Sequence, residues 1–143
     1  MEITLALTGK GSQVALFLGE ELSHHFDLLD LAPDDKIAGR PPQPLDDPRA
    51  FGQAVYQALF PQSSPAAAAL ANRPQRILLV ARDRALQSVP WEYAYDQNEG
   101  FLVRRTSFLR GLAPEQRRPA PDLSQTELHI TAVPSNPLHP GLA

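Results

Sequence analysis

The sequence predicts an α/β fold in which a β-hairpin precedes a mostly parallel sheet. Residues 3–8 and 14–18 alternate apolar with smaller or polar side chains on either side of Gly9-Lys10-Gly11-Ser12, which is typical of a hairpin. Apolar residues recur at helical spacing over 51–59. A continuous apolar run at 77–81 then follows, as expected of a buried parallel strand.

The N-terminal unit is expected to span residues 1–45 and to consist of the hairpin and a loop. Residues 24–31 fit a third strand, with Phe26 and Leu28 on one face, but a helix is an open alternative. Five of the chain's 15 prolines lie in residues 33–48. Proline lacks the N–H that a helix or a strand ladder needs, so this stretch is predicted to be a loop.

Two helices are predicted next. Asp46 or Asp47 as N-cap, with Pro48 in the first turn, begins a helix that runs to about Phe60. Pro61 stops it. A second, alanine-rich helix begins at Ser64-Pro65 and ends near residues 71–72.

The remaining elements are shorter. After the strand at 76–81, the pattern predicts a helical turn at 90–96, a turn at 98–100, brief strands at 101–103 and 106–109, a loop at 113–126 and a last strand at 128–133.

Composition excludes several classes of protein. The chain of 143 residues has no cysteine, so a thiolate nucleophile, a disulfide and a sulfur-ligated zinc are ruled out. It has no apolar run of about 20 residues and no signal peptide. A net charge of −3 argues against a nucleic-acid partner. We therefore expect a cytoplasmic protein that binds neither membrane nor nucleic acid.

Phosphate and metal sites are not predicted. Gly9-Lys10-Gly11-Ser12 lacks the upstream glycine and the following helix of a phosphate-binding loop. The neighbours His24 and His25 point to opposite faces if they lie on a strand. His129 and His139 have no carboxylate at ligand spacing. No metal or cofactor is expected.

No catalytic residue is predicted either. Ser135 and His139 invite comparison with a hydrolase, but the Gly-x-Ser-x-Gly turn is absent. The basic excess of the second half is concentrated in five arginines, which fit either an anion-binding face or a solvated loop and strand edge: Arg104, Arg105, Arg110, Arg117 and Arg118.

The block Pro90-Trp91-Glu92 is the least ordinary feature of the sequence, and its three residues are assigned a structural role. Glu92 stands beside the single Trp in an apolar setting, where a carboxylate needs a charged or hydrogen-bonding partner. We expect that partner among the nearby arginines Arg82, Arg84, Arg104 and Arg105. A catalytic-base role for Glu92 is the alternative, although no second catalytic group accompanies it.

The same region resembles the early part of a CHAT domain, the bacterial caspase-like domain often found with tetratricopeptide repeats. The resemblance rests on residues 76–96, which read RILLVARDRALQSVPWEYAYD, followed by Gly100-Phe101-Leu102-Val103 and Phe108-Leu109-Arg110. The stretch LHITAVP at 128–134 is similar to a later strand of the family that ends in proline. The resemblance covers about residues 46–137.

The resemblance implies an incomplete caspase-like α/β/α sandwich, with residues 46–143 as the N-terminal part of the domain. Active CHAT members are cysteine peptidases whose His and Cys follow later strands, in His-Gly and Ala-Cys motifs that are absent here. The expected function is to scaffold a peptidase of a longer parent protein. A short gene product and one half of a two-chain peptidase are further explanations.

A non-enzymatic protein-interaction module is the alternative function. The expected partner is a protein or the remainder of the parent chain. An uncovered sheet edge also predicts self-association.

Overall fold

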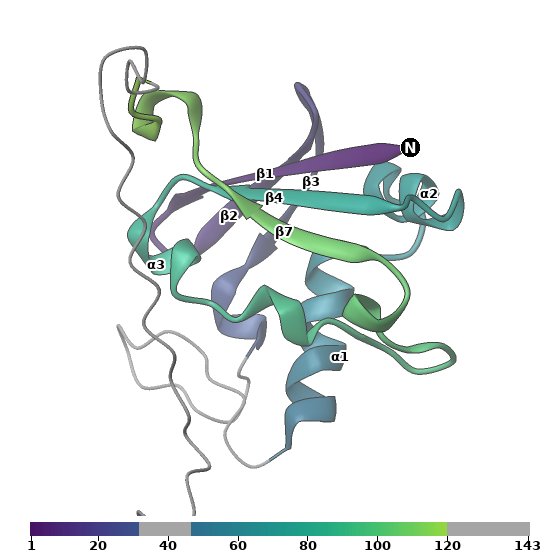
Figure 1. Ribbon diagram of the computed structural model, residues 1–143. Helices are drawn as coiled ribbons and strands as arrows, with labels where there is room; N and C mark the ends of the chain where they lie inside the picture. Colours follow the sequence, from purple (N-terminus) through teal and green to yellow (C-terminus); the bar gives the residue numbers. More distant parts are fainter. Residues whose placement is uncertain (32–46, 120–143) are drawn as a thin grey trace, which may run out of the picture.

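The computed structural model describes residues 1–31 and 47–119. Its main feature is a five-stranded sheet in the order β3-β2-β1-β4-β7 (Figure 1). The strands are β1 Glu2–Lys10, β2 Gln13–Leu18, β3 Glu21–Asp27, β4 Arg76–Ala81 and β7 Ser107–Gly111. β2 pairs antiparallel with β1 and β3, whereas β4 pairs parallel with β1 and β7. Four of the five strands therefore run in one direction, and the mostly parallel sheet is confirmed.

The predicted hairpin is formed by β1 and β2. Leu7 of β1 lies opposite Leu16 of β2, and the turn places Gly11 at φ 63°, in the left-handed region that glycine tolerates. For residues 24–31 the sequence allowed either a strand or a helix, and the structure contains both. The strand β3 ends at Asp27, and the 3₁₀ helix η1 (Leu28–Leu31) follows it.

The hairpin is part of the core sheet rather than a separate unit before it. β1 lies between β2 and β4, and Leu5 of β1 is paired with Leu79 of β4. The residues on either side of 32–46 thus share one sheet and one core. The proline-rich segment between them lies outside the described residues.

Both predicted long helices are confirmed with their caps. In α1 (Pro48–Leu59), the Asp47 carboxylate accepts the N–H groups of Arg49 and Ala50. In α2 (Pro65–Ala71), the Ser64 hydroxyl accepts the N–H of Ala67. These side chains satisfy backbone donors that have no partner within the helix.

The helices α1, α2 and α3 (Arg84–Gln87) contribute buried residues to the core on one face of the sheet, whereas η4 (Pro114–Gln116) does not. Alternate residues of β1 and β4, such as Leu7 and Leu79, are buried there with Val55 and Leu59 of α1. The described residues therefore form two layers, and the predicted three-layer sandwich is not confirmed. The opposite sheet face carries the half-buried Phe17 and Leu78 and the exposed Leu22 and Leu109.

The link from β4 to β7 consists of short elements: α3 Arg84–Gln87, η2 Trp91–Tyr93, β5 Tyr95–Asp96, β6 Gly100–Phe101 and η3 Leu102–Arg104. The strand predicted at 101–103 is wrong beyond Phe101. The carbonyl of Leu102 accepts the N–H groups of Arg105 and Thr106, which turns the chain into η3.

After β7 the chain forms η4 (Pro114–Gln116) inside the predicted loop. The strand predicted at 128–133 lies outside the described residues. Among the described helices, none combines the length and the apolar character needed to cross a membrane.

Candidate functional site

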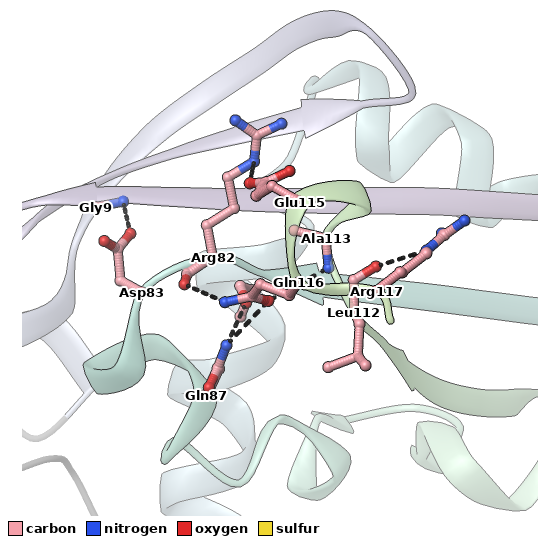
Figure 2. A network of polar contacts seen from close by, with 10 residues as sticks. Gly9, Arg82, Asp83, Gln87, Leu112, Ala113, Glu115, Gln116 and Arg117 are labelled. Atoms are coloured by element: carbon pink, nitrogen blue, oxygen red, sulfur yellow. Dashed lines mark hydrogen bonds and ion pairs between the residues drawn. The ribbon is translucent and has the colours of Figure 1, made fainter. Parts of the chain in front are cut away.

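The carboxyl ends of the parallel strands β1, β4 and β7 meet at one edge of the sheet. In open α/β sheets, ligands and catalytic groups are placed outside this edge. Here the edge is occupied by a network of polar contacts between the end of β1, the link after β4 and the segment after β7 (Figure 2). We treat this region as the candidate site.

Asp83 joins the link after β4 to the end of β1. Its carboxylate Oδ2 accepts the backbone N–H of Gly9 at 2.7 Å (Figure 2). A Cβ atom placed on Gly9 would lie 3.4 Å from that oxygen, an ordinary van der Waals contact, so the hydrogen bond does not itself require glycine. The bond connects two segments that are 74 positions apart in the sequence.

The segment with η4 folds over the end of β4. The side-chain amide of Gln116 donates to the carbonyl of Arg82 at 3.2 Å, and the amide of Gln87 lies 3.5 Å from the Gln116 side-chain oxygen (Figure 2). Ala113 is fully buried beside it. The ion pair of Arg82 with Glu115 spans 3.5 Å between exposed side chains and contributes little.

Trp91 anchors the link to the core. Its side chain is fully buried, and its indole Nε1–H donates to the carbonyl of Leu86 at 2.7 Å. The ring meets Phe26 of β3 edge to face, with centroids 6.2 Å apart. Pro90 precedes η2, and its carbonyl accepts the N–H of Tyr93. Pro90 and Trp91 thus define the path from α3 to η2.

Glu92 forms a bidentate ion pair with Arg110 of β7. Arg110 Nε donates to one carboxylate oxygen and Nη2 donates to the other at 2.6 Å. The same guanidinium donates to the carbonyls of Gln87 and Val89, the latter at 2.8 Å. Four of the five guanidinium donors are used, so Arg110 fixes the link from Gln87 to Glu92 against the edge strand.

The sequence-based prediction of the Glu92 partner is therefore wrong. Arg82 faces Glu115, and Arg105 is paired with Glu99. Glu92 is also half-buried rather than enclosed, with 38% of its side chain exposed. The partner comes from β7 because parallel pairing with β4 places Arg110 opposite Leu79, on the side of the sheet that η2 covers.

The ion pair shifts the pKa of both groups. Partial burial by itself raises the pKa of Glu92, but the hydrogen bonds from Arg110 and from the backbone N–H of Glu92, with the charge of Arg110, outweigh it and lower the pKa overall. The hydrogen bond to Glu92 raises the pKa of Arg110. Both shifts favour the charged form of the group, so the ion pair persists at neutral pH.

A cavity of about 210 Å³ adjoins this pair. Its walls are Leu79, Ala81, Gln87, Arg110, Gly111 and Leu112. Because Arg110 is already bound to Glu92 and to two carbonyls, it offers little to an anion.

The five arginines do not behave as one anion-binding face. Arg105 and Arg110 are neutralised by Glu99 and Glu92, and Arg117 Nε donates to the carbonyl of Leu112 at 3.2 Å. This arrangement favours the interpretation as a solvated loop and strand edge.

His24 and His25 have the orientation expected of neighbouring residues on a strand. His24 lies opposite Leu16 and His25 opposite Ala15, so their rings face opposite sides of the sheet. His24 Nε2 lies 2.7 Å from the carbonyl of Ala58. No cluster of three metal-ligating side chains occurs in the part of the chain that the structure describes. His129, Ser135 and His139 lie outside it.

Comparison of the chain with protein-family models, with curated proteins and with solved structures gives no match. The resemblance to the CHAT domain rests on the residues quoted above.

Proposed function

We propose that this chain is the N-terminal segment of a CHAT-type, caspase-like domain in a cytoplasmic bacterial protein. Its role is to scaffold a cysteine peptidase whose His–Cys dyad lies outside this chain. The chain contains no cysteine, so it does not perform the reaction by itself.

The observation that carries the proposal is the edge strand β7. Within the described residues, β7 pairs only with β4, and its second edge takes no strand. An edge with unpaired N–H and C=O groups is a template for a further strand. In a caspase-like domain the catalytic residues follow later strands of the sheet, and pairing of such strands with β7 is what the proposal requires.

The Pro90-Trp91-Glu92 block supports this role. Through Trp91 the link is joined to the core, and through Glu92 it is joined to Arg110 on the template strand itself. The block therefore fixes the position of β7 without taking part in chemistry.

The test is to extend the protein with the coding sequence that follows Ala143 and to treat both forms with acyloxymethyl ketone probes, which alkylate catalytic cysteines. We expect the extended protein to be labelled at one cysteine and the 143-residue chain to remain unlabelled. Labelling that persists after substitution of the histidine in the predicted His-Gly motif would contradict the proposal, as would an extension that encodes no reactive cysteine.

A non-enzymatic interaction module is the second candidate. It is favoured by large apolar side chains that are exposed to solvent, among them Leu22, Leu109 and Leu112. Exposed apolar surface can serve as a protein contact. A stop codon directly after Ala143, together with absence of labelling, supports this candidate.

A further inference from the structure

A cleft unrelated to the β7 edge lies between α1 and the hairpin of β5 and β6. Its volume of about 370 Å³ falls within the range of small-ligand sites, about 300–1,000 Å³. Three kinds of side chain dominate its walls: aromatic rings, carboxamides and one carboxylate. These are Tyr56, Phe60, Tyr95, Gln53, Gln57, Gln62, Gln97, Asn98 and Asp96.

Gly52 allows the two walls of the cleft to approach. A Cβ atom at this position would lie 2.2 Å from the carbonyl oxygen of Tyr93 and 2.8 Å from Cβ of Tyr95. Only glycine permits α1 to pack this closely on the chain that enters β5. Tyr95 is held in turn by Phe101, with an edge-to-face centroid distance of 4.9 Å. The cleft is thus built from fixed elements.

The aromatic rings provide an apolar surface that is partly open. Tyr56 and Tyr95 are half-buried, and the Tyr56 ring packs against Phe60 at a centroid distance of 5.5 Å. The guanidinium of Arg49 lies 6.0 Å from the centroid of Tyr95. Phe60 is buried, and Phe101 and Arg49 pack on Tyr95. The apolar surface left for C–H groups of a ligand is therefore the part of Tyr56 and Tyr95 that stays open.

The polar groups of the cleft favour a neutral ligand with many hydrogen-bonding groups. Carboxamides both donate and accept, and five of them line the cleft. Asp96 Oδ1 accepts the N–H groups of Asn98 and Glu99 at 2.8 and 3.0 Å, which orients the hairpin tip. No lysine or arginine is among the lining residues, but Arg49 lies over the Tyr95 ring and Arg105 lies beside Tyr56, so these two guanidinium groups offset the charge of Asp96.

We propose that this cleft binds a neutral oligosaccharide. Sugar rings combine C–H faces, which match the tyrosine rings, with hydroxyl groups, which donate and accept as the carboxamides do. A proline-rich peptide is the other ligand for aromatic clefts, but its ring nitrogens donate no hydrogen bonds to carboxamide or carboxylate oxygens. The proposal is independent of the peptidase-scaffold function.

The test is a titration of the ¹⁵N-labelled 143-residue chain, followed by NMR, with maltotriose, cellotriose and triacetylchitotriose. We expect saturable shifts of the Gln57 and Asn98 side-chain amides with at least one of the three. Gln57→Ala, an exposed position that leaves the fold intact, should weaken binding about fivefold, the loss of one hydrogen bond. Gln75→Ala, exposed outside the cleft, is the matched control and should leave affinity unchanged.

Two outcomes overturn the proposal. One is the absence of saturable shifts with all three sugars at about 10 mM, enough to detect a Kd of about 1 mM. The other is equal weakening by Gln57→Ala and Gln75→Ala, which places the sugar elsewhere. A decaproline peptide titrated in parallel distinguishes the two ligand classes, and saturation of the same amide signals by the peptide alone also rejects the saccharide.

Discussion

Arg110 on the edge strand holds the carboxylate of Glu92 through two N–H groups, across 18 positions of sequence. It also donates to the carbonyls of Gln87 and Val89, so one side chain joins β7 to the whole link from α3 to η2. The Pro90-Trp91-Glu92 block therefore positions β7, the edge strand of the described sheet.

Arg110→Ala should lower the free energy of unfolding by about 1–2 kcal/mol, because two carbonyls and a carboxylate lose their donor while solvent screens the half-exposed ion pair. Chemical denaturation measures the change. Arg104→Ala, an exposed arginine of η3, is the control and should stay within about 0.5 kcal/mol. Equal effects of the two variants would show that the ion pair is not an anchor.

Glu92→Gln should make stability less dependent on acid pH. Because the pKa of folded Glu92 lies below its ordinary value of 4.5, the ion pair stabilises the fold fully above pH 4.5. That stabilisation is lost as the pH falls through the folded-state pKa. The difference in melting temperature between wild type and Glu92→Gln should thus be constant from pH 5 to 7 and shrink below pH 4.5. A difference that grows on acidification contradicts this linkage.

Trp91→Ala should destabilise the fold by about 3–5 kcal/mol, the range for removal of a large buried aromatic side chain. Trp91→Phe keeps most of the packing but leaves the carbonyl of Leu86 without its donor, so its effect should be smaller. Circular dichroism melts of both variants give the comparison. Similar losses for Phe and Ala would mean that the hydrogen bond, rather than the packing, dominates.

Gly52→Ala should destabilise by about 1–3 kcal/mol, since the new Cβ meets the backbone oxygen of Tyr93 at 2.2 Å and α1 must shift. The sign of the change in unfolding free energy is informative, because in a helix without this close contact alanine is more favourable than glycine by about 1 kcal/mol. Gln53→Ala, the adjacent helical position, is the control and should be close to neutral. A Gly52→Ala protein more stable than wild type would disprove the close packing of α1 on the β5 segment.

The chain should self-associate as its concentration rises, through the edge of β7 that takes no strand within residues 1–31 and 47–119, and through its exposed Leu109. Leu109→Lys should reduce the association, because a charged side chain on an edge strand opposes strand pairing. Light scattering across a concentration series tests both statements. Val103→Lys, also exposed but on η3, is the matched control. A monodisperse monomer at high concentration would contradict the prediction.

Local sequence was sufficient for most elements. Period-two alternation identified β1 and β2, and the caps Asp47 and Ser64 located both long helices. It failed at 102–104, where hydrogen bonds to the carbonyl of Leu102 replace strand pairing. The partner of Glu92 was also missed. One signal in the sequence pointed to Arg110. It lies two positions after Phe108, so on a strand both side chains are on the same face. That face is covered, and a charged side chain there requires a counter-ion.

By itself, the sequence determined the hairpin, the helix limits, the buried strand at 76–81 and the absence of a cysteine nucleophile, because each depends on neighbouring residues or on composition. Only the tertiary structure decided that β1 lies between β2 and β4, that α1, α2 and α3 pack on one sheet face, and that Glu92 binds Arg110. The pairing of β1 with β4 joins residues 74 positions apart, and that of Glu92 with Arg110 joins residues 18 positions apart. Their pairing follows from strand order and burial in the whole sheet, which no local pattern encodes.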